Sequence, residues 1–285
     1  MADAPRIPIL SGISELDTTH RAWLVDVWGV MHNGVSAFRE AVNACARFRA
    51  SGGFVVLLTN APRPAPSVVT QLTKLGVMPA AYDAVLTSGD VTRGLISAWQ
   101  HLKLFHIGPE RDLPLFADLV ETFASEDEAE VIVCTGLFDD DREMPDDYRD
   151  RFQAFKARNA AMLCANPDLK VERGERIVPC AGAMAAAYEA IGGDVVYAGK
   201  PHGPIYELAR DVIKRGVGED VADGDILCIG DGVLTDIKGA SDAGLQSVYI
   251  ASAIHLAPGA MTEDAVAETF QDFAKPPIAA LRALA

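Results

Sequence analysis

Two carboxylates stand directly after an apolar run in the last third of the chain. Asp231 and Asp236 lie five positions apart, and the turn between them contains Gly232. The preceding residues, 226–230, have the composition of a buried strand. In open α/β sheets, ligands bind beyond the carboxyl ends of the strands, and hard cations such as Mg²⁺ prefer oxygen ligands. The spacing therefore indicates a metal site at the edge of a parallel sheet.

Three further apolar runs also end in polar side chains. Asp26 closes one, Thr59 the next and Lys200 a later one, so the order along the chain is carboxylate, hydroxyl, ammonium and paired carboxylates. Phosphoryl transfer to a carboxylate needs such a set: an Asp nucleophile, a cation and donors for the equatorial oxygens. We expect Asp26 to be nucleophile and metal ligand, and Thr59 and Lys200 to hold the phosphate. Asp231 would be the second metal ligand, and Asp236 would fix a metal-bound water or orient Lys200.

Each of these segments alone also has an ordinary structural interpretation. An Asp after a strand is often the N-cap of the next helix, and a Gly-Lys-Pro segment such as the one at Lys200 is often a solvated turn. The combination of all four segments in this order, each after a strand, favours the functional interpretation.

The elements that must position these residues are predicted from the hydrophobic pattern. Apolar runs rich in β-branched residues alternate with helical patterns, which predicts βαβ units, parallel strands and an α/β fold. Strands are expected at 23–27, 54–58, 84–87, 104–107, 131–134, 161–164, 195–198, 227–229 and 247–250, and helices at 37–50, 66–75, 89–100, 146–158, 181–190, 204–215, 235–243 and 277–284.

Length and composition limit the kinds of partner and compartment. The 285 residues fit one large or two modest domains, and the net charge of -15 disfavours nucleic acid or an anionic membrane as main partner. The five cysteines are odd in number and lie mostly in apolar runs, a pattern typical of reduced thiols rather than a disulfide framework. No run approaches the roughly 20 apolar residues of a membrane span, and residues 1–10 lack the apolar core of a signal peptide. We therefore expect a cytoplasmic protein.

The four segments, in this order, resemble the four motifs of the haloacid dehalogenase-like (HAD) phosphohydrolase superfamily. Ala165-Asn-Pro-Asp-Leu169, Pro179-Cys-Ala-Gly-Ala-Met184 and Gly199-Lys-Pro-His-Gly-Pro-Ile-Tyr206 resemble class IIA of that superfamily, in which a large α/β cap of type C2A is inserted between the second and third motifs.

The resemblance implies a division of the chain and a chemistry. It implies a Rossmann-like parallel-sheet core over 1–86 and 196–285 and a cap over 87–195. It further implies a Mg²⁺-dependent phosphatase that acts on a small phosphorylated metabolite through an aspartyl-phosphate intermediate. Similar proteins often dimerise through the cap, so a homodimer is a possible assembly.

The chain departs from the family pattern at Trp28, where the family carries a second Asp that acts as general acid and base. An indole cannot take that role near neutral pH, and such groups contribute roughly 10²–10⁴-fold in rate. The metal would still receive the main-chain carbonyl that the resemblance assigns to this position.

Three interpretations of Trp28 stay open. The substrate could have a good leaving group such as an acyl phosphate, or His32 or His202 could transfer the proton. Alternatively, the chain could be a catalytically impaired phosphate-ligand-binding or regulatory protein on the same fold. Trp28 itself could cover the phosphate site or stack on a flat substrate.

Substrate contacts are expected from the loop after the second motif and from the loop after Asp26. Asn60 and Arg63 lie in a proline-rich stretch, where similar class IIA enzymes seat substrate, and Arg63 has the fork geometry that binds phosphate. Trp28 and His32 complete the expected substrate-binding set. The cap offers further candidates for specificity, namely Arg93, Asp139–Asp141, Arg142 and Asp168.

Overall fold

The computed structural model describes residues 6–16, 19–173, 176–251 and 261–285. The chain forms two compact units. Unit 1 comprises Met1–Thr59, Val68–Leu86 and Tyr206–Ala285, and unit 2 comprises Asn60–Ser67 and Thr87–Ile205. The assignment of a catalytic core to 1–86 plus 196–285 and of a cap to 87–195 stays a prediction.

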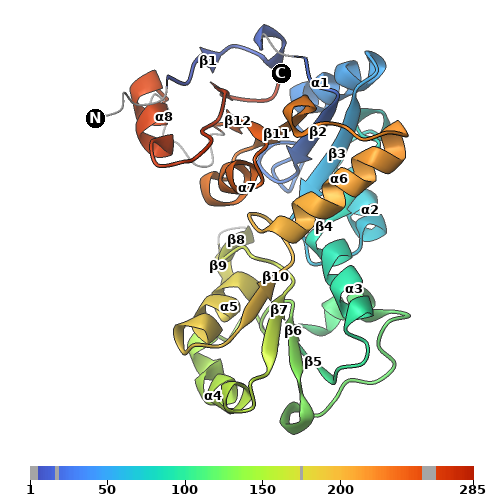
Figure 1. The fold of residues 1–285 in the computed structure, drawn as a ribbon, viewed down its shortest axis with the longest axis vertical. Helices are drawn as coiled ribbons and strands as arrows, with labels where there is room; N and C mark the ends of the chain where they lie inside the picture. The colour runs from blue at the N-terminus through green and yellow to red at the C-terminus, as the bar shows by residue number, and fades with distance from the viewer. Residues whose placement is uncertain (1–5, 17–18, 174–175, 252–260) are drawn as a thin grey trace. The chain divides into compact units, whose positions relative to one another are not determined.

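The larger sheet has seven strands in the order β1-β13-β12-β11-β2-β3-β4 (Figure 1). Every residue of β2 and β11 is buried, because near-continuous apolar strands are stable only where both faces of the sheet are covered. The pairs β11–β2, β2–β3 and β11–β12 are parallel, as the alternation of strands and helices predicts. The strands are β1 (Ile9–Leu10), β2 (Ala22–Asp26), β3 (Phe54–Thr59), β4 (Ala84–Thr87), β11 (Ile226–Gly230), β12 (Gln246–Ile250) and β13 (Ala279–Leu281).

Helices pack on this sheet and bury their apolar residues against it. Helix α1 packs on β3, and α7 packs on β12. The aromatic rings of Trp23 on β2 and Phe48 on α1 stack with centroids 3.9 Å apart, which ties the first strand to the first helix. The helices are α1 (Arg39–Ala50), α2 (Ala65–Leu75), α6 (Gly203–Val217), α7 (Lys238–Asp242) and α8 (Glu263–Phe270), with 3₁₀ turns at Ile13–Glu15, Pro79–Ala81 and Asp223–Asp225 and a π turn at Val233–Ile237.

Unit 2 contains a second parallel sheet with its own hydrophobic core. Its four strands lie in the order β10-β7-β6-β5, and a separate antiparallel hairpin pairs β8 with β9. Phe152, Phe155 and Tyr188 are fully buried in the core, and the Tyr188 hydroxyl donates to the Ala160 carbonyl at 2.6 Å. The elements are α3 (Ser88–Ala98), β5 (Leu104–Ile107), β6 (Val131–Cys134), α4 (Arg149–Ala157), β7 (Ala161–Cys164), β8 (Lys170–Arg173), β9 (Arg176–Pro179), α5 (Ala181–Ala190) and β10 (Val195–Tyr197), with 3₁₀ turns at Glu110–Phe116, Glu126–Glu128 and Pro145–Tyr148.

The predicted fold class is confirmed, and most predicted strands agree with the structure within one residue at each end. One predicted helix is wrong: within 277–284, Ala279–Leu281 forms strand β13, which pairs in parallel with both β1 and β12. Alanine favours helices, but propensity is a weak prior that sheet pairing overrides here. The segments predicted as helices at 146–158 and 235–243 each begin with a turn of different pitch, 3₁₀ in the first and π in the second.

All five cysteines lie in the described ranges as buried thiols. Burial raises the pKa of the Cys45 thiol to about 12 and that of the Cys134 thiol to about 12, so both stay protonated and weakly reactive. Among the helices of the described ranges, none is both long enough and apolar enough to cross a bilayer.

Candidate functional site

The carboxyl ends of three adjacent strands bring together residues that the sequence places far apart. Strand β2 lies between β11 and β3, and its last residue is Asp26. The register pairs Asp26 with Leu58, so Thr59 at the end of β3 lies one position farther along the neighbouring strand. On the other side, Asp231 directly follows β11. In a parallel sheet this edge is where ligands bind.

Three carboxylates gather at this edge. Asp26, Asp231 and Asp236 each contribute an oxygen, and these oxygens lie within 4.8 Å of one another. The three residues are only 8%, 4% and 5% exposed. Buried like charges at this separation are unfavourable unless a cation neutralises them. A group of buried carboxylate oxygens therefore fits a hard divalent cation such as Mg²⁺.

The negative charge of this cluster acts on a neighbouring side chain. Tyr206, on α6, is fully buried. Burial, together with the nearby charges of Cys228, Asp236 and Asp26, raises the pKa of its hydroxyl well above the usual value. The phenol is therefore held in its neutral form beside the carboxylates.

The loop after Asp26 is closed by its own main chain. The Val27 carbonyl accepts hydrogen bonds from the amides of Met31 and His32 at 2.9 and 3.2 Å, and the Gly29 amide donates to the His32 carbonyl at 2.8 Å. Gly29 has a φ of 87°, a conformation that favours glycine. A Cβ at Gly29 would overlap the carboxylate of Asp231, so the absence of a side chain lets the two loops meet.

The loop after β11 is shaped around Asp236. Its carboxylate accepts a hydrogen bond from the Gly232 amide at 3.0 Å, and its own amide donates to the Gly232 carbonyl at 2.9 Å. A Cβ at Gly230 would overlap the Asp236 side chain. The π turn Val233–Ile237 then turns Asp236 back toward Asp231, and such turns often occur at functional sites.

His32 is held in one protonation state by its surroundings. Its Nδ1 accepts a hydrogen bond from the Gly34 amide at 2.9 Å, so the ring proton of the neutral form lies on Nε2. Burial lowers the pKa of His32, and the residue is 4% exposed. Nε2 is therefore a hydrogen-bond donor near neutral pH. It is not a ready proton acceptor.

Trp28 lies in the same loop and is half-buried. Its indole Nε1 is beside Gly34, where a Cβ would approach it to 3.6 Å. The second histidine considered for proton transfer, His202, belongs to unit 2, where its ring stacks on Tyr197 with centroids 4.2 Å apart.

Unit 2 carries the remaining predicted site residues, Lys200, Asn60 and Arg63. Lys200 is 3% exposed and Asn60 is 6% exposed. The side chain of Asn60 bonds to both main-chain groups of Lys200 and to the carboxylate of Asp168. The Arg63 carbonyl accepts a hydrogen bond from the Thr87 hydroxyl at 2.7 Å, which anchors the main chain of this segment to the start of α3.

A buried polar group beside β5 and β6 escaped prediction from the sequence. His106 Nε2 is 2.9 Å from the Thr135 hydroxyl, and burial lowers the pKa of His106 to about 4. Burial raises the pKa of the nearby Asp112 carboxyl, whereas the Thr135 hydroxyl and the charges of Arg111 and Arg63 act in the opposite direction. A histidine within the apolar run Leu104–Ile107 was the one available signal.

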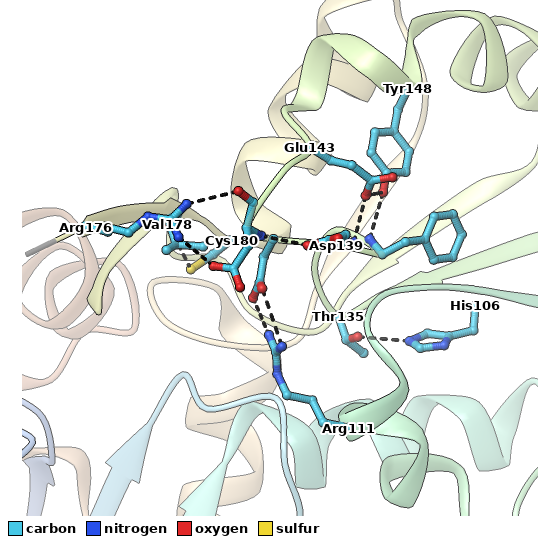
Figure 2. Close-up of polar contacts among 12 residues, drawn as sticks. His106, Arg111, Thr135, Asp139, Glu143, Tyr148, Arg176, Val178 and Cys180 are labelled. Carbon is cyan, nitrogen blue, oxygen red and sulfur yellow. Dashed lines mark hydrogen bonds and ion pairs between the residues drawn. The ribbon is translucent and has the colours of Figure 1, made fainter. Parts of the chain in front are cut away.

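The acidic loop after β6 makes ion pairs within unit 2 (Figure 2). Arg111 pairs with Asp140, and Arg176 on β9 pairs with Asp141 at 2.9 Å. Glu143 accepts hydrogen bonds from the Tyr148 hydroxyl at 2.6 Å and from the Asp139 amide at 2.8 Å.

Arg93, another specificity candidate, donates to the carbonyls of Leu115 and Ala117. Arg93 and the acidic side chains of this loop therefore brace their own unit.

Within unit 1 the structure thus brings Asp26, Asp231 and Asp236 together and places Thr59 at the same sheet edge. The catalytic, substrate-binding and metal-binding roles of the predicted residues stay predictions.

Models of two families match separate parts of the chain. A haloacid dehalogenase-like hydrolase model matches residues 23–119, which include Asp26 and Thr59. A HAD-hydrolase-like model matches residues 197–273, which include Lys200, Asp231 and Asp236.

Solved structures and a curated protein are similar over most of the chain. A hydrolase of the haloacid dehalogenase-like family from Brucella suis 1330 is 45% identical, with 97% of this chain and 100% of that chain covered and a TM-score of 0.82. A p-nitrophenyl phosphatase from Archaeoglobus fulgidus is 20% identical, with 93% and 97% covered and a TM-score of 0.70. The 5'-nucleotidase YutF of Bacillus subtilis (strain 168) is 24% identical over 237 residues, which are 81% of this chain and 87% of that protein.

Proposed function

Since this chain belongs to the haloacid dehalogenase-like hydrolases, we propose that it is a Mg²⁺-dependent phosphatase that acts on a small phosphorylated metabolite. The observation that carries the proposal is the cluster of three buried carboxylates at the carboxyl edge of the larger sheet. The names of two more distant relatives, a p-nitrophenyl phosphatase and a 5'-nucleotidase, support phosphate esters as the substrate class. The buried thiols support a cytoplasmic location.

Mg²⁺ would be held by Asp26, Asp231, the main-chain carbonyl of Trp28 and Asp236. Its charge would lower the repulsion between the Asp26 carboxylate and the phosphate dianion. This assignment agrees with the hard oxygen donors of the cluster and with their burial at one edge of the sheet.

Asp26 attacks phosphorus, a bond forms from its carboxylate oxygen to phosphorus, and the bond from phosphorus to the leaving oxygen breaks. Water then attacks phosphorus of the resulting aspartyl phosphate, which releases inorganic phosphate and regenerates Asp26. Thr59 and Lys200 hold the oxygens of the transferring phosphoryl group. Arg63, Trp28 and His32 are assigned to the substrate side of the site, whereas both side-chain N–H groups of Asn60 are already bonded within unit 2.

Trp28 narrows the class of substrate. The leaving oxygen receives no proton from the side chain at this position, because indole has no acidic proton near neutral pH. The Nδ1 of His32 is bonded to the Gly34 amide, so this ring offers only a weakly acidic Nε2–H. Substrates whose leaving group departs as a stable anion, such as acyl phosphates and aryl phosphates, are therefore favoured over alkyl phosphates.

Trp28 also supports a second candidate function, a phosphate-ligand-binding or regulatory protein that turns over slowly or not at all. Hydrolysis of acetyl phosphate and p-nitrophenyl phosphate, measured with and without Mg²⁺, separates the two candidates. The phosphatase should hydrolyse both substrates in the presence of Mg²⁺. Asp26→Asn should lower turnover by roughly 10³-fold or more while the melting temperature shows a folded protein. Phosphate binding with no Mg²⁺-dependent turnover of either substrate would establish the binding protein instead.

A further inference from the structure

The side-chain amide of Asn60 forms two hydrogen bonds with the main chain of Lys200. The Lys200 amide donates to Oδ1 of Asn60 at 2.8 Å, and Nδ2 of Asn60 donates to the Lys200 carbonyl at 3.0 Å. Both contacts are buried. The orientation of the Asn60 amide follows from its partners, because a main-chain N–H only donates and a carbonyl only accepts.

A third hydrogen bond fixes the other edge of the same amide. Nδ2 of Asn60 also donates to Oδ1 of Asp168 at 2.9 Å. Asp168 lies in the loop after β7, where its own amide donates to the Asn166 side chain at 3.1 Å. An Asn side chain has two N–H groups, and here both have acceptors from unit 2. Asn60 therefore has no remaining side-chain donor to offer a substrate.

Neighbouring segments of unit 2 pack closely against this amide. A Cβ at Gly199 would overlap Oδ1 of Asn60 and would lie 2.8 Å from Cδ of Pro167. The Ser88 hydroxyl, at the start of α3, donates to the Asn60 carbonyl at 2.8 Å. Asn60 is thus fixed through both its main chain and its side chain.

We propose that Asn60 is a positioning residue that acts through Lys200, with Asp168 as its anchor. The proposal rests on the proposed function, in which the Lys200 ammonium holds the transferring phosphoryl group. A lysine side chain is long and flexible, so the direction in which it extends depends on how firmly its main chain is held. Asn60 directly follows Thr59, so one peptide segment carries the hydroxyl expected at the phosphoryl group and holds the main chain of the lysine.

A charge exchange between positions 60 and 168 tests this role. Asn60→Asp keeps an acceptor for the Lys200 amide but sets a carboxylate against the Lys200 carbonyl and against Asp168. We expect kcat for p-nitrophenyl phosphate to fall by roughly 10²-fold, the loss typical of a slightly misplaced catalytic group, with KM changed by less than roughly 3-fold. In the double variant Asn60→Asp/Asp168→Asn, the new Asn can donate to the new Asp, and kcat should recover by roughly 10-fold.

Asp168→Asn alone completes the double-mutant cycle. Its side-chain oxygen can still accept from Nδ2 of Asn60, so its loss of kcat should be smaller than that of Asn60→Asp. If Asn60 instead contacted substrate directly, Asn60→Asp would mainly raise KM and the exchange would not restore activity, which would overturn the proposal. Unchanged kcat in Asn60→Asp would overturn it as well.

Melting temperatures distinguish failure of the positioning role of Asn60 from failure of the proposed phosphatase function. If wild type hydrolyses neither test substrate with Mg²⁺, the phosphatase assignment fails. The hydrogen bonds of Asn60 with Lys200 and Asp168 can still be tested through the melting temperatures of the variants. Asn60→Asp should then lower the melting temperature by roughly 2–4 °C, and the exchange should restore most of that loss. A double variant no more stable than Asn60→Asp would show that the two side chains are not coupled.

Discussion

Asp26, Asp231 and Asp236 are acidic side chains that share one buried region of unit 1. Their mutual repulsion is present in the folded state and absent in the unfolded chain, where the three residues lie far apart in solvent. A bound cation would convert this repulsion into attraction. The cluster therefore links the proposed metal binding directly to the free energy of unfolding.

Mg²⁺ should raise the melting temperature of the protein. At a concentration near 100 times the dissociation constant, binding to the folded state adds about 2.7 kcal/mol to the free energy of unfolding. Asp231→Asn should lose most of this increase, because one of the proposed carboxylate ligands is removed. Thermal unfolding with graded Mg²⁺ measures both effects. An Asp231→Asn variant that responds to Mg²⁺ as wild type does would remove Asp231 from the metal site.

Trp28→Asp should create the missing acid and base. We expect turnover of an alkyl phosphate such as glycerol phosphate to rise by roughly 10²–10⁴-fold, and turnover of p-nitrophenyl phosphate to change much less, because its leaving group needs little protonation. The comparison of kcat/KM for the two substrates isolates proton transfer from general damage to the site. Trp28→Asn is the matched control, because Asn is similar to Asp in size but has no ionisable group. Equal gains in both variants would mean that the indole limits access instead.

The residues at strand ends could be predicted from the sequence, whereas their neighbours could not. Asp26, Thr59 and Asp231 each follow an apolar run, so hydrophobic pattern and sheet topology together bring them to one edge. The bonds of Asn60 with Lys200 and Asp168 depend on contacts between segments more than 100 positions apart in the sequence, and no local pattern encodes them.

At the level of elements, the local pattern predicted most strands and helices but missed β1, β8, β9, β13 and α8. Strand β13 has three residues and is defined by its neighbours β12 and β1, and the hairpin of β8 and β9 was not predicted at all. Short segments gain little from their own propensity, so tertiary pairing decides their conformation. The loops at the site are encoded more directly, because Gly29 must adopt a positive φ and must leave space for Asp231.

The buried side chain of His106 on β5 should make the stability of unit 2 depend on pH. The pKa of His106 is lowered by burial to about 4, from an ordinary value near 6.5. The unfolded chain therefore binds more protons between these values. The contribution of this histidine to the free energy of unfolding is fully present above about pH 6.5. It decreases as the pH falls toward about 4, by up to about 3 kcal/mol.

Denaturant unfolding at several pH values, compared between wild type and His106→Gln, measures this contribution. Gln can still donate to the Thr135 hydroxyl but does not titrate. Burial also raises the pKa of the nearby Asp112 carboxyl, so the difference between the two proteins is the informative quantity. If the stabilities of both proteins fall in parallel below pH 6.5, His106 is not the group responsible.

At the level of the whole molecule, the chain builds two units, each with its own parallel sheet and its own hydrophobic core. The length allowed one large or two modest domains, and the expected division into core and cap came from the resemblance to class IIA. In the structure Lys200 and Asn60 fall in unit 2, while the expected division placed both in the core. The hydrogen bonds of Asn60 with Lys200 and Asp168 lie within unit 2, and contacts between such distant segments are invisible in composition.

Substitutions in the two cores should therefore act separately. Phe152→Ala removes a buried ring from unit 2, and Leu24→Ala removes a buried side chain from β2 in unit 1. The first should cost about 3–5 kcal/mol and the second about 2–5 kcal/mol. Because Phe152 packs in the core of unit 2 and Leu24 lies in the sheet of unit 1, Phe152→Ala should accelerate amide hydrogen exchange in β6 and β7 and leave β2 and β11 protected, and Leu24→Ala should do the reverse. Hydrogen exchange followed by mass spectrometry resolves these strands, and equal acceleration in both sheets for either variant would show that the two units unfold as one cooperative body.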